Sequence, residues 1–236
     1  MLQQIDISGI IQVFIVQLII AIIFIIVGLK IIRNNKKRLN YTFSGFYFCV
    51  AIGALLNIVY SIIKIELPVL MLNFITNFFV SFGLIFIYST NQIILKSSMV
   101  YDLKSQEKYM VLYGVLLILS IVFYFFGFGV TINASTNWKP NWHLFYYLYM
   151  NLIVTIFAII PMLYTSLKIY KDFKDETLRK RWKYYLIGLI GLIVYMYGAF
   201  FNNLINMPIF RFVFSIFGLS VILWLILLYY GVGRQI

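Results

Sequence analysis

The sequence predicts an all-α polytopic membrane protein, a seven-transmembrane helix bundle that forms a single domain over residues 1–236. Composition is the first observation behind this prediction. Of the residues, 63% are hydrophobic and 11% are charged, whereas soluble globular proteins have about 45–50% and about 25%. The second observation is a series of seven continuous apolar runs, each near the roughly 20 residues that a helix needs to cross the hydrocarbon core. The third is the gathering of basic residues in alternate loops, which is typical of loops on the cytoplasmic side.

The seven runs are predicted to be helices because they lack the period of two that barrel strands show. The first is predicted to be a retained span and not a signal peptide, since it is long and its basic cluster follows it. The predicted spans cover residues 10–29, 41–63, 69–93, 110–130, 145–167, 184–204 and 212–230. Pro161 is expected to bend the fifth span. Gly188, Gly191 and Gly198 are expected to let the sixth span approach a neighbour closely.

The loop charges predict that the N-terminus lies outside and the C-terminus inside. In this orientation the outer side carries only three of the 19 basic residues, Lys64, Lys139 and Arg211. Such an asymmetry is the positive-inside pattern of a multi-pass protein, so we expect the cell membrane as the location and the lipid bilayer as a partner. The formal net charge of +12 then reflects topology, and no nucleic-acid partner is expected.

Spans one to three and spans five to seven share their direction. Each triplet has a basic loop followed by a hairpin with a proline, Pro68 in one and Pro208 in the other. This pattern predicts a 3+1+3 layout, which occurs in carriers built from parallel repeats. The alternative is that any seven-span protein shows the same pattern.

Charged chemistry is not expected inside the membrane. All seven carboxylates fall in loops or at membrane edges, and a proton relay or ion site usually needs one within a span. No lysine lies in the middle of the seventh span, which excludes a retinal Schiff base. His143 and Cys49, the one histidine and one cysteine, cannot form a zinc site. We therefore expect no catalysis, no cofactor and no metal.

Uncharged polar side chains gather in the predicted outer halves of several spans. Asn73 and Asn77 lie four residues apart and so share one helical face, as do Asn202 and Asn206. Polar groups at one depth on several helices predict a ligand-binding cavity that opens outward. The predicted ligand-binding residues are Asn57, Tyr60, Asn73, Asn77, Asn151, Tyr197, Asn202, Asn206 and Arg211.

Two other interpretations of these residues remain open. They could form hydrogen bonds between helices, which are common in bundles, or they could line a water-filled path. The inner halves hold fewer polar residues, among them Asn91 and Gln92. This difference favours a pocket, because a carrier needs polar lining on both sides. The basic run Arg179, Lys180 and Arg181 is a candidate contact for anionic lipid or a cytoplasmic partner, or it is a topology signal alone.

The chain resembles the seven-span N-terminal sensor region of prokaryotic histidine kinases. The resemblance lies in the short hairpin between spans two and three, in the segment from Leu178 to Gly188, in Asn202-Asn203-Leu204, and in Tyr229-Tyr230-Gly231. It implies a sensor whose last helix drives a cytoplasmic domain. Because this sequence stops where that domain would begin, the resemblance implies a stand-alone sensor that needs a separate partner.

We therefore expect a sensor or receptor that binds an uncharged or lipophilic ligand in the outward pocket and signals through a cytoplasmic partner. One alternative is a small-solute transporter, similar in layout to the SWEET sugar carriers but without their Pro-Gln signature. The other is a non-catalytic membrane scaffold subunit.

Overall fold

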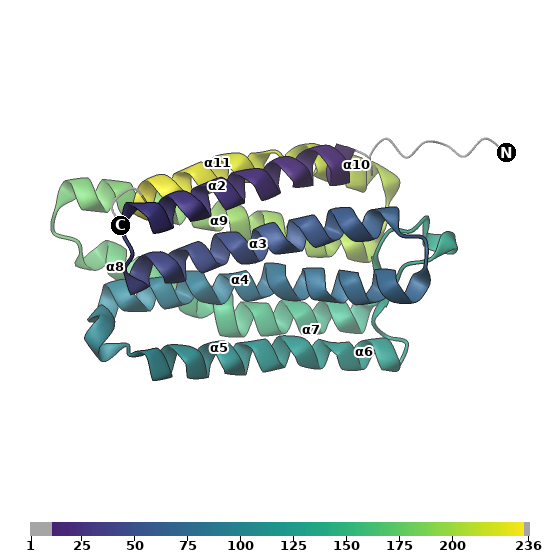
Figure 1. Ribbon diagram of the computed structural model, residues 1–236, viewed down its shortest axis with the longest axis horizontal. Helices are drawn as coiled ribbons and strands as arrows, with labels where there is room; N and C mark the ends of the chain where they lie inside the picture. Colours follow the sequence, from purple (N-terminus) through teal and green to yellow (C-terminus); the bar gives the residue numbers. More distant parts are fainter. Residues whose placement is uncertain (1–10, 234–236) are drawn as a thin grey trace.

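The computed structural model describes residues 11–233, and in this part of the chain seven helices are long and apolar enough to cross a membrane (Figure 1). They cover Val13–Asn34, Arg38–Ile62, Glu66–Ser97, Leu103–Phe125, Leu144–Asp172, Glu176–Ile205 and Pro208–Val232. Each predicted span overlaps one of them, so the all-α helical bundle is confirmed, and the length and composition of the seven helices indicate a multi-pass membrane protein. Residue 10, where the first predicted span begins, lies outside the described residues.

Several of these helices contain more than one helical segment. The first comprises η1 (Ile11–Gln17) and α2 (Leu18–Asn34), and it is followed by α3 (Arg38–Ile62) and α4 (Glu66–Val100). The fourth comprises α5 (Leu103–Ile118), η2 (Leu119–Ile121) and α6 (Val122–Phe125). The fifth comprises α7 (Leu144–Val154), η4 (Thr155–Ile159) and α8 (Ile160–Asp172). The sixth is α9 (Glu176–Ile205), and the seventh comprises α10 (Pro208–Phe217), α11 (Ser220–Leu228) and η5 (Tyr229–Gly233).

Successive helices run in opposite directions, so the bundle has two distinct ends (Figure 1). We call the end formed by residues 63–65, 126–143 and 206–207 the hairpin end, and the end formed by residues 35–37, 101–102 and 173–175 the basic end. Among the described residues, the basic side chains other than Lys64, Lys139 and Arg211 lie in the half of the bundle next to the basic end. This is the charge separation that the predicted orientation requires. The side of the membrane that each end faces stays a prediction.

The fourth helix corrects the sequence prediction. Residues 110–130 are predicted to be one span, but the helix begins at Leu103 and ends at Phe125. The chain turns at Gly127, whose φ of +74° suits glycine. It then forms a two-stranded antiparallel ribbon of β1 (Val130–Thr131) and β2 (Asn141–Trp142), with Val130 opposite Trp142. The prediction is wrong here because the apolar run continues through a turn that hydrophobicity alone does not reveal.

Backbone irregularity around Pro161 takes the form of a π-helical segment. This segment, η4, covers Thr155–Ile159 and ends directly before α8, in which Pro161 lies in the first turn. A proline inside a helix removes one backbone donor and clashes with the preceding turn. The wider helical turn accommodates this loss without ending the span.

Glycines hold the sixth and seventh helices together. A Cβ atom on Gly188 would lie 2.5 Å from the carbonyl oxygen of Trp224, and one on Gly191 would lie 2.2 Å from the Trp224 ring. Gly198 faces Phe214 in the same way, at 2.5 Å. The prediction that these three glycines allow close helix approach is therefore confirmed. We call the contact of Gly188, Gly191 and Gly231 with the opposite helix the glycine seam.

Candidate ligand-binding cavity

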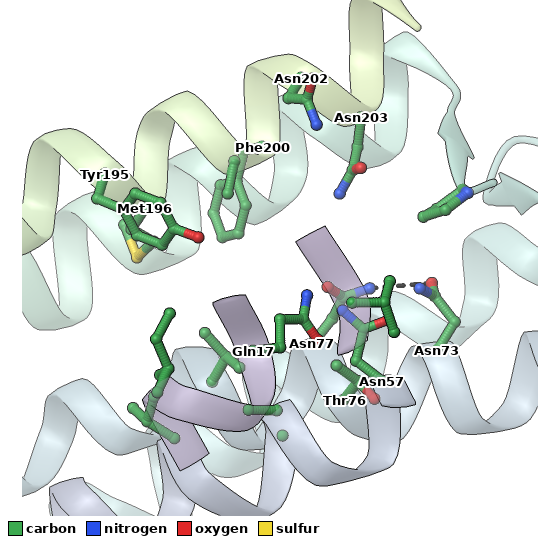
Figure 2. A pocket seen from close by; sticks show the side chains of 18 of the residues that line it. Gln17, Asn57, Asn73, Thr76, Asn77, Tyr195, Met196, Phe200, Asn202 and Asn203 are labelled. Carbon is green, nitrogen blue, oxygen red and sulfur yellow. Dashed lines mark hydrogen bonds between the residues drawn. The ribbon is translucent and has the colours of Figure 1, made fainter. Parts of the chain in front are cut away.

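A cavity of about 240 Å³ lies among α2, α3, α4, α9 and α10 in the half of the bundle next to the hairpin end. Figure 2 shows polar side chains gathered toward one part of it and apolar ones toward the other. A second cavity, of about 300 Å³, lies between α4, α6 and β1 and is lined mostly by apolar residues. The predicted polar residues line the first cavity and not the second.

Six of the nine predicted ligand-binding residues line this cavity. They are Asn57, Tyr60, Asn73, Asn77, Asn202 and Arg211. Three of them form a chain of hydrogen bonds. Asn77 Nδ2 donates to Asn73 Oδ1 at 3.0 Å, and Asn73 Nδ2 donates to the Tyr60 hydroxyl at 3.1 Å. This series of hydrogen bonds links α4 to α3 and holds the amide groups at the cavity wall.

The other three predicted residues lie outside the lining. Asn151 donates to the carbonyl of Tyr147 in its own helix at 2.7 Å. The Tyr197 hydroxyl bonds to Thr155 across the contact between η4 and α9. Asn206 follows the last residue of α9 and has a left-handed φ of 53°. The expectation that Asn202 and Asn206 share a helical face is therefore wrong, because the helix ends between them.

Several lining residues were not among those predicted. Gln17 and Thr76 come from within spans, and Trp138, Lys139 and Pro140 come from the loop between η3 (Ala134–Thr136) and β2. A glutamine within an apolar run, such as Gln17 within residues 10–29, is a signal that sequence reasoning could have used. The loop residues carry no such signal, because only the fold brings the β-ribbon over the helices.

The loop over the cavity is attached to the helices on two sides. Arg211, one turn inside α10 and 5% exposed, donates from Nη2 to the Pro140 carbonyl at 2.6 Å. The Lys64 ammonium lies 5.5 Å from the centre of the Trp138 ring. Asn137 and Trp138 both have positive φ angles, 53° and 59°, a backbone conformation that is costly for residues other than glycine. The hairpin end of the cavity is thus covered by a loop in a specific, constrained conformation.

The cavity ends inside the bundle against aromatic and aliphatic side chains. Phe24, Phe46, Leu84 and Met196 line this apolar part, which we call the floor. The Phe24 ring packs on those of Phe46 and Tyr47, with centroid distances of 5.8 and 5.6 Å. These packed rings give the floor an apolar surface.

Beyond the floor, toward the basic end, polar side chains bond one another. Asn91 Nδ2 donates to Ser166 Oγ at 2.7 Å, and the Tyr185 hydroxyl donates to Asn91 Oδ1 at 2.7 Å. Trp182 Nε1 donates to the Ser166 carbonyl at 2.8 Å. We call these four residues the inner polar cluster. Because its groups are satisfied by α4, α8 and α9, it joins helices instead of lining the cavity.

The basic run lies at the far end of α9 from the cavity. Arg179 and Lys180 are exposed and Arg181 is half-buried.

Within the described residues, no group of three or more histidine, cysteine, aspartate or glutamate side chains could hold a metal ion. No family model, curated protein or solved structure matches this chain.

Proposed function

We propose that this protein is a membrane sensor of the receptor type. It takes a small lipophilic molecule into the cavity at the hairpin end and signals through a separate partner at the basic end. In this proposal the hairpin end faces the outside of the cell membrane. The resemblance to the sensor regions of histidine kinases points to the same role.

One observation carries the proposal: the cavity has a polar rim and an apolar floor, and it ends inside the bundle. Ligand sites are concave, mostly apolar, and carry a few polar groups that fix the orientation of the ligand. A carrier needs a path that reaches both membrane faces, but the inner polar cluster is bonded to itself beyond the floor. The geometry therefore favours a receptor over a transporter.

The sixth helix supplies a route from the cavity to a partner. Asn202 lines the cavity near one end of α9, and the exposed side chains of Arg179 and Lys180 lie near the other end. A ligand can shift the packing of α9 only by the difference in its affinity for two arrangements of the bundle. We propose that a partner reads this shift at the basic run.

Filling the cavity tests the proposal directly. Ala54 lines the cavity, whereas Ile52 on the same helix is 39% exposed and faces away from it. We expect eight-carbon amphiphiles such as octanoate and 1-octanol to raise the melting temperature of the protein in phosphatidylcholine nanodiscs, since binding stabilises the folded state. Ala54→Phe should abolish the shift, and Ile52→Phe should keep it. Equal shifts in both variants would place binding elsewhere and remove the cavity from the proposal.

Flux measurements address the transporter alternative. Proteoliposomes that contain the protein should take up labelled glucose or glycerol no faster than protein-free liposomes. Uptake that Ala54→Phe blocks would show that the cavity belongs to a transport path, and the sensor proposal would fail.

A further inference from the structure

Gln17, Asn202 and Asn203 form the part of the polar rim that presents hydrogen-bond donors to the centre of the cavity, whereas Asn77, whose amide nitrogen donates to Asn73, leaves its oxygen as an acceptor. Figure 2 shows the amide groups of Gln17, Asn202 and Asn203 directed into the cavity with their nitrogen atoms innermost. The oxygen atoms of Gln17 and Asn202 are buried away from it, and neither has a hydrogen-bond partner among the described residues. Groups that donate inward suit a ligand whose head accepts hydrogen bonds.

The charged lining residues have one sign. Lys139 and Arg211 line the cavity, and no aspartate or glutamate is among the lining residues. Arg211 is buried and holds the Pro140 carbonyl, so its guanidinium is fixed in position at the rim. Guanidinium groups bind carboxylates and phosphates through strong charge-assisted hydrogen bonds.

The size and the floor of the cavity define the rest of the ligand. The cavity volume is about 240 Å³. The floor residues Phe24, Leu84 and Met196 are apolar, and Tyr195 beside Met196 adds a hydroxyl (Figure 2), so the deeper part of the cavity suits a mostly apolar chain. Two lipid chains would not fit, but a single short chain would.

We propose that the ligand is a carboxylate with one aliphatic chain of about six to ten carbons. Its head would lie at the rim with Arg211, Asn202 and Gln17, and its chain would extend to the floor. This proposal rests on the proposed function, because it assigns a ligand class to the same cavity.

Three probes with the same chain and different heads test the proposal. They are octanoate, 1-octanol and octylamine, titrated against the protein in phosphatidylcholine nanodiscs at pH 7.5, where the carboxylate is ionised. Thermal shifts give the affinities. We expect octanoate to bind at least tenfold more tightly than 1-octanol, and octylamine to cause no shift. From hexanoate to octanoate, each added methylene should tighten binding about fourfold.

Variants at the rim locate the carboxylate. Arg211→Gln and Asn202→Leu should bring the affinity for octanoate down to that for 1-octanol. Lys139→Gln, on the loop, should weaken octanoate binding at least threefold and gives a second readout if Arg211→Gln does not fold. Lys174→Gln removes the same charge at the basic end, far from the cavity lining, and should leave the preference for octanoate unchanged.

The outcomes separate this proposal from the proposed function. Equal binding of octanoate and 1-octanol, or tighter binding of octylamine, overturns the carboxylate assignment while ligand binding at the cavity stands. Absence of any shift with all three probes overturns both. A last experiment repeats the octanoate titration in nanodiscs that contain phosphatidylglycerol. Loss of the thermal shift there would show that an anionic lipid headgroup occupies the rim, and it would overturn the proposal that the ligand is a free carboxylate.

Discussion

Arg38 shows at the scale of one residue how a basic side chain can do more than set topology. Its guanidinium donates to Gln106 Oε1 at 2.7 Å and to the carbonyl oxygens of Tyr101 and Asp102 at 2.7 and 3.0 Å. These bonds tie the start of α3 to the turn between α4 and α5. Sequence reasoning counts Arg38 only as a cytoplasmic charge, because its partners are more than sixty residues away along the chain.

Replacement of Arg38 by lysine should lower the stability of the bundle. A lysine ammonium keeps the charge but cannot reach three acceptors with the planar fork of a guanidinium. We expect Arg38→Lys to lower the free energy of unfolding by about 1–3 kcal/mol, measured by thermal or denaturant unfolding in detergent. Lys36→Arg, at an exposed neighbouring position, is the control. Unchanged stability in Arg38→Lys would show that the bonds contribute nothing net.

Asp102 makes the start of α5 sensitive to acid. Hydrogen bonds from the side chain and the backbone of Ser105 lower the pKa of Asp102 below its ordinary value of 3.8. A lowered pKa in the folded state means that the carboxylate stabilises this helix start above about pH 3.8, and that the stabilisation is lost as the pH falls through the folded value. The first turn of α5 should therefore lose amide exchange protection at pH 3 relative to pH 6, after correction for intrinsic rates.

Asp102→Asn provides the matched control for this pH dependence. Asparagine caps helices about as well as aspartate but does not titrate. Its first-turn protection should therefore be the same at both pH values. A variant that still loses protection in acid would show that another group causes the effect.

At the scale of elements, helix existence follows from hydrophobic runs, but helix ends and helix contacts do not. Each predicted span overlaps a real helix, because roughly 20 apolar residues have few other stable environments. The end of the fourth helix was missed because Phe126 and Phe128 are as apolar as the residues of the span. Asn206 was misplaced for a related reason: the spacing rule holds only within a helix.

Alanine at the glycine seam should separate α9 from the last helix. A methyl group on Gly188 would meet the Trp224 carbonyl at 2.5 Å and the Leu228 amide nitrogen at 2.7 Å. Backbone atoms cannot move aside as side chains can, so we expect a loss of about 1–3 kcal/mol. Gly114→Ala is the control, since it would contact only the Phe82 ring, from 3.2 Å. Thermal unfolding in detergent distinguishes them, and equal melting temperatures would contradict a tight seam.

At the scale of the whole molecule, the candidate cavity was predictable in place but not in detail. Amide residues at one depth on different spans identified the wall that Asn57, Asn73 and Asn202 form. The loop over the cavity could not be predicted, because Trp138 and Pro140 reach it through the β-ribbon. The inner polar cluster could not be predicted either, since composition does not tell whether a buried asparagine such as Asn91 bonds a neighbour or faces a cavity.

The orientation of the whole bundle in the membrane can be tested on the intact protein. The positive-inside pattern predicts that the hairpin end is outside. In a Cys49→Ala background, a cysteine at exposed Lys64 should react with a membrane-impermeant maleimide in intact cells. A cysteine at exposed Lys174 should react only after permeabilisation. The reverse labelling pattern would invert the bundle, and labelling of both sites in intact cells would contradict the three spans expected between them.

The contact of Gly231 with the sixth helix has a mechanical consequence. A Cβ at this position would come within 2.7 Å of the Tyr185 amide nitrogen and 2.9 Å of the Arg181 carbonyl oxygen, so the two backbones touch just before the basic run. We expect this close contact to resist sliding of one helix past the other, so that the two helices move as a unit. In the proposed sensor, a displacement of α9 that begins at Asn202 would then also move the far end of the last helix.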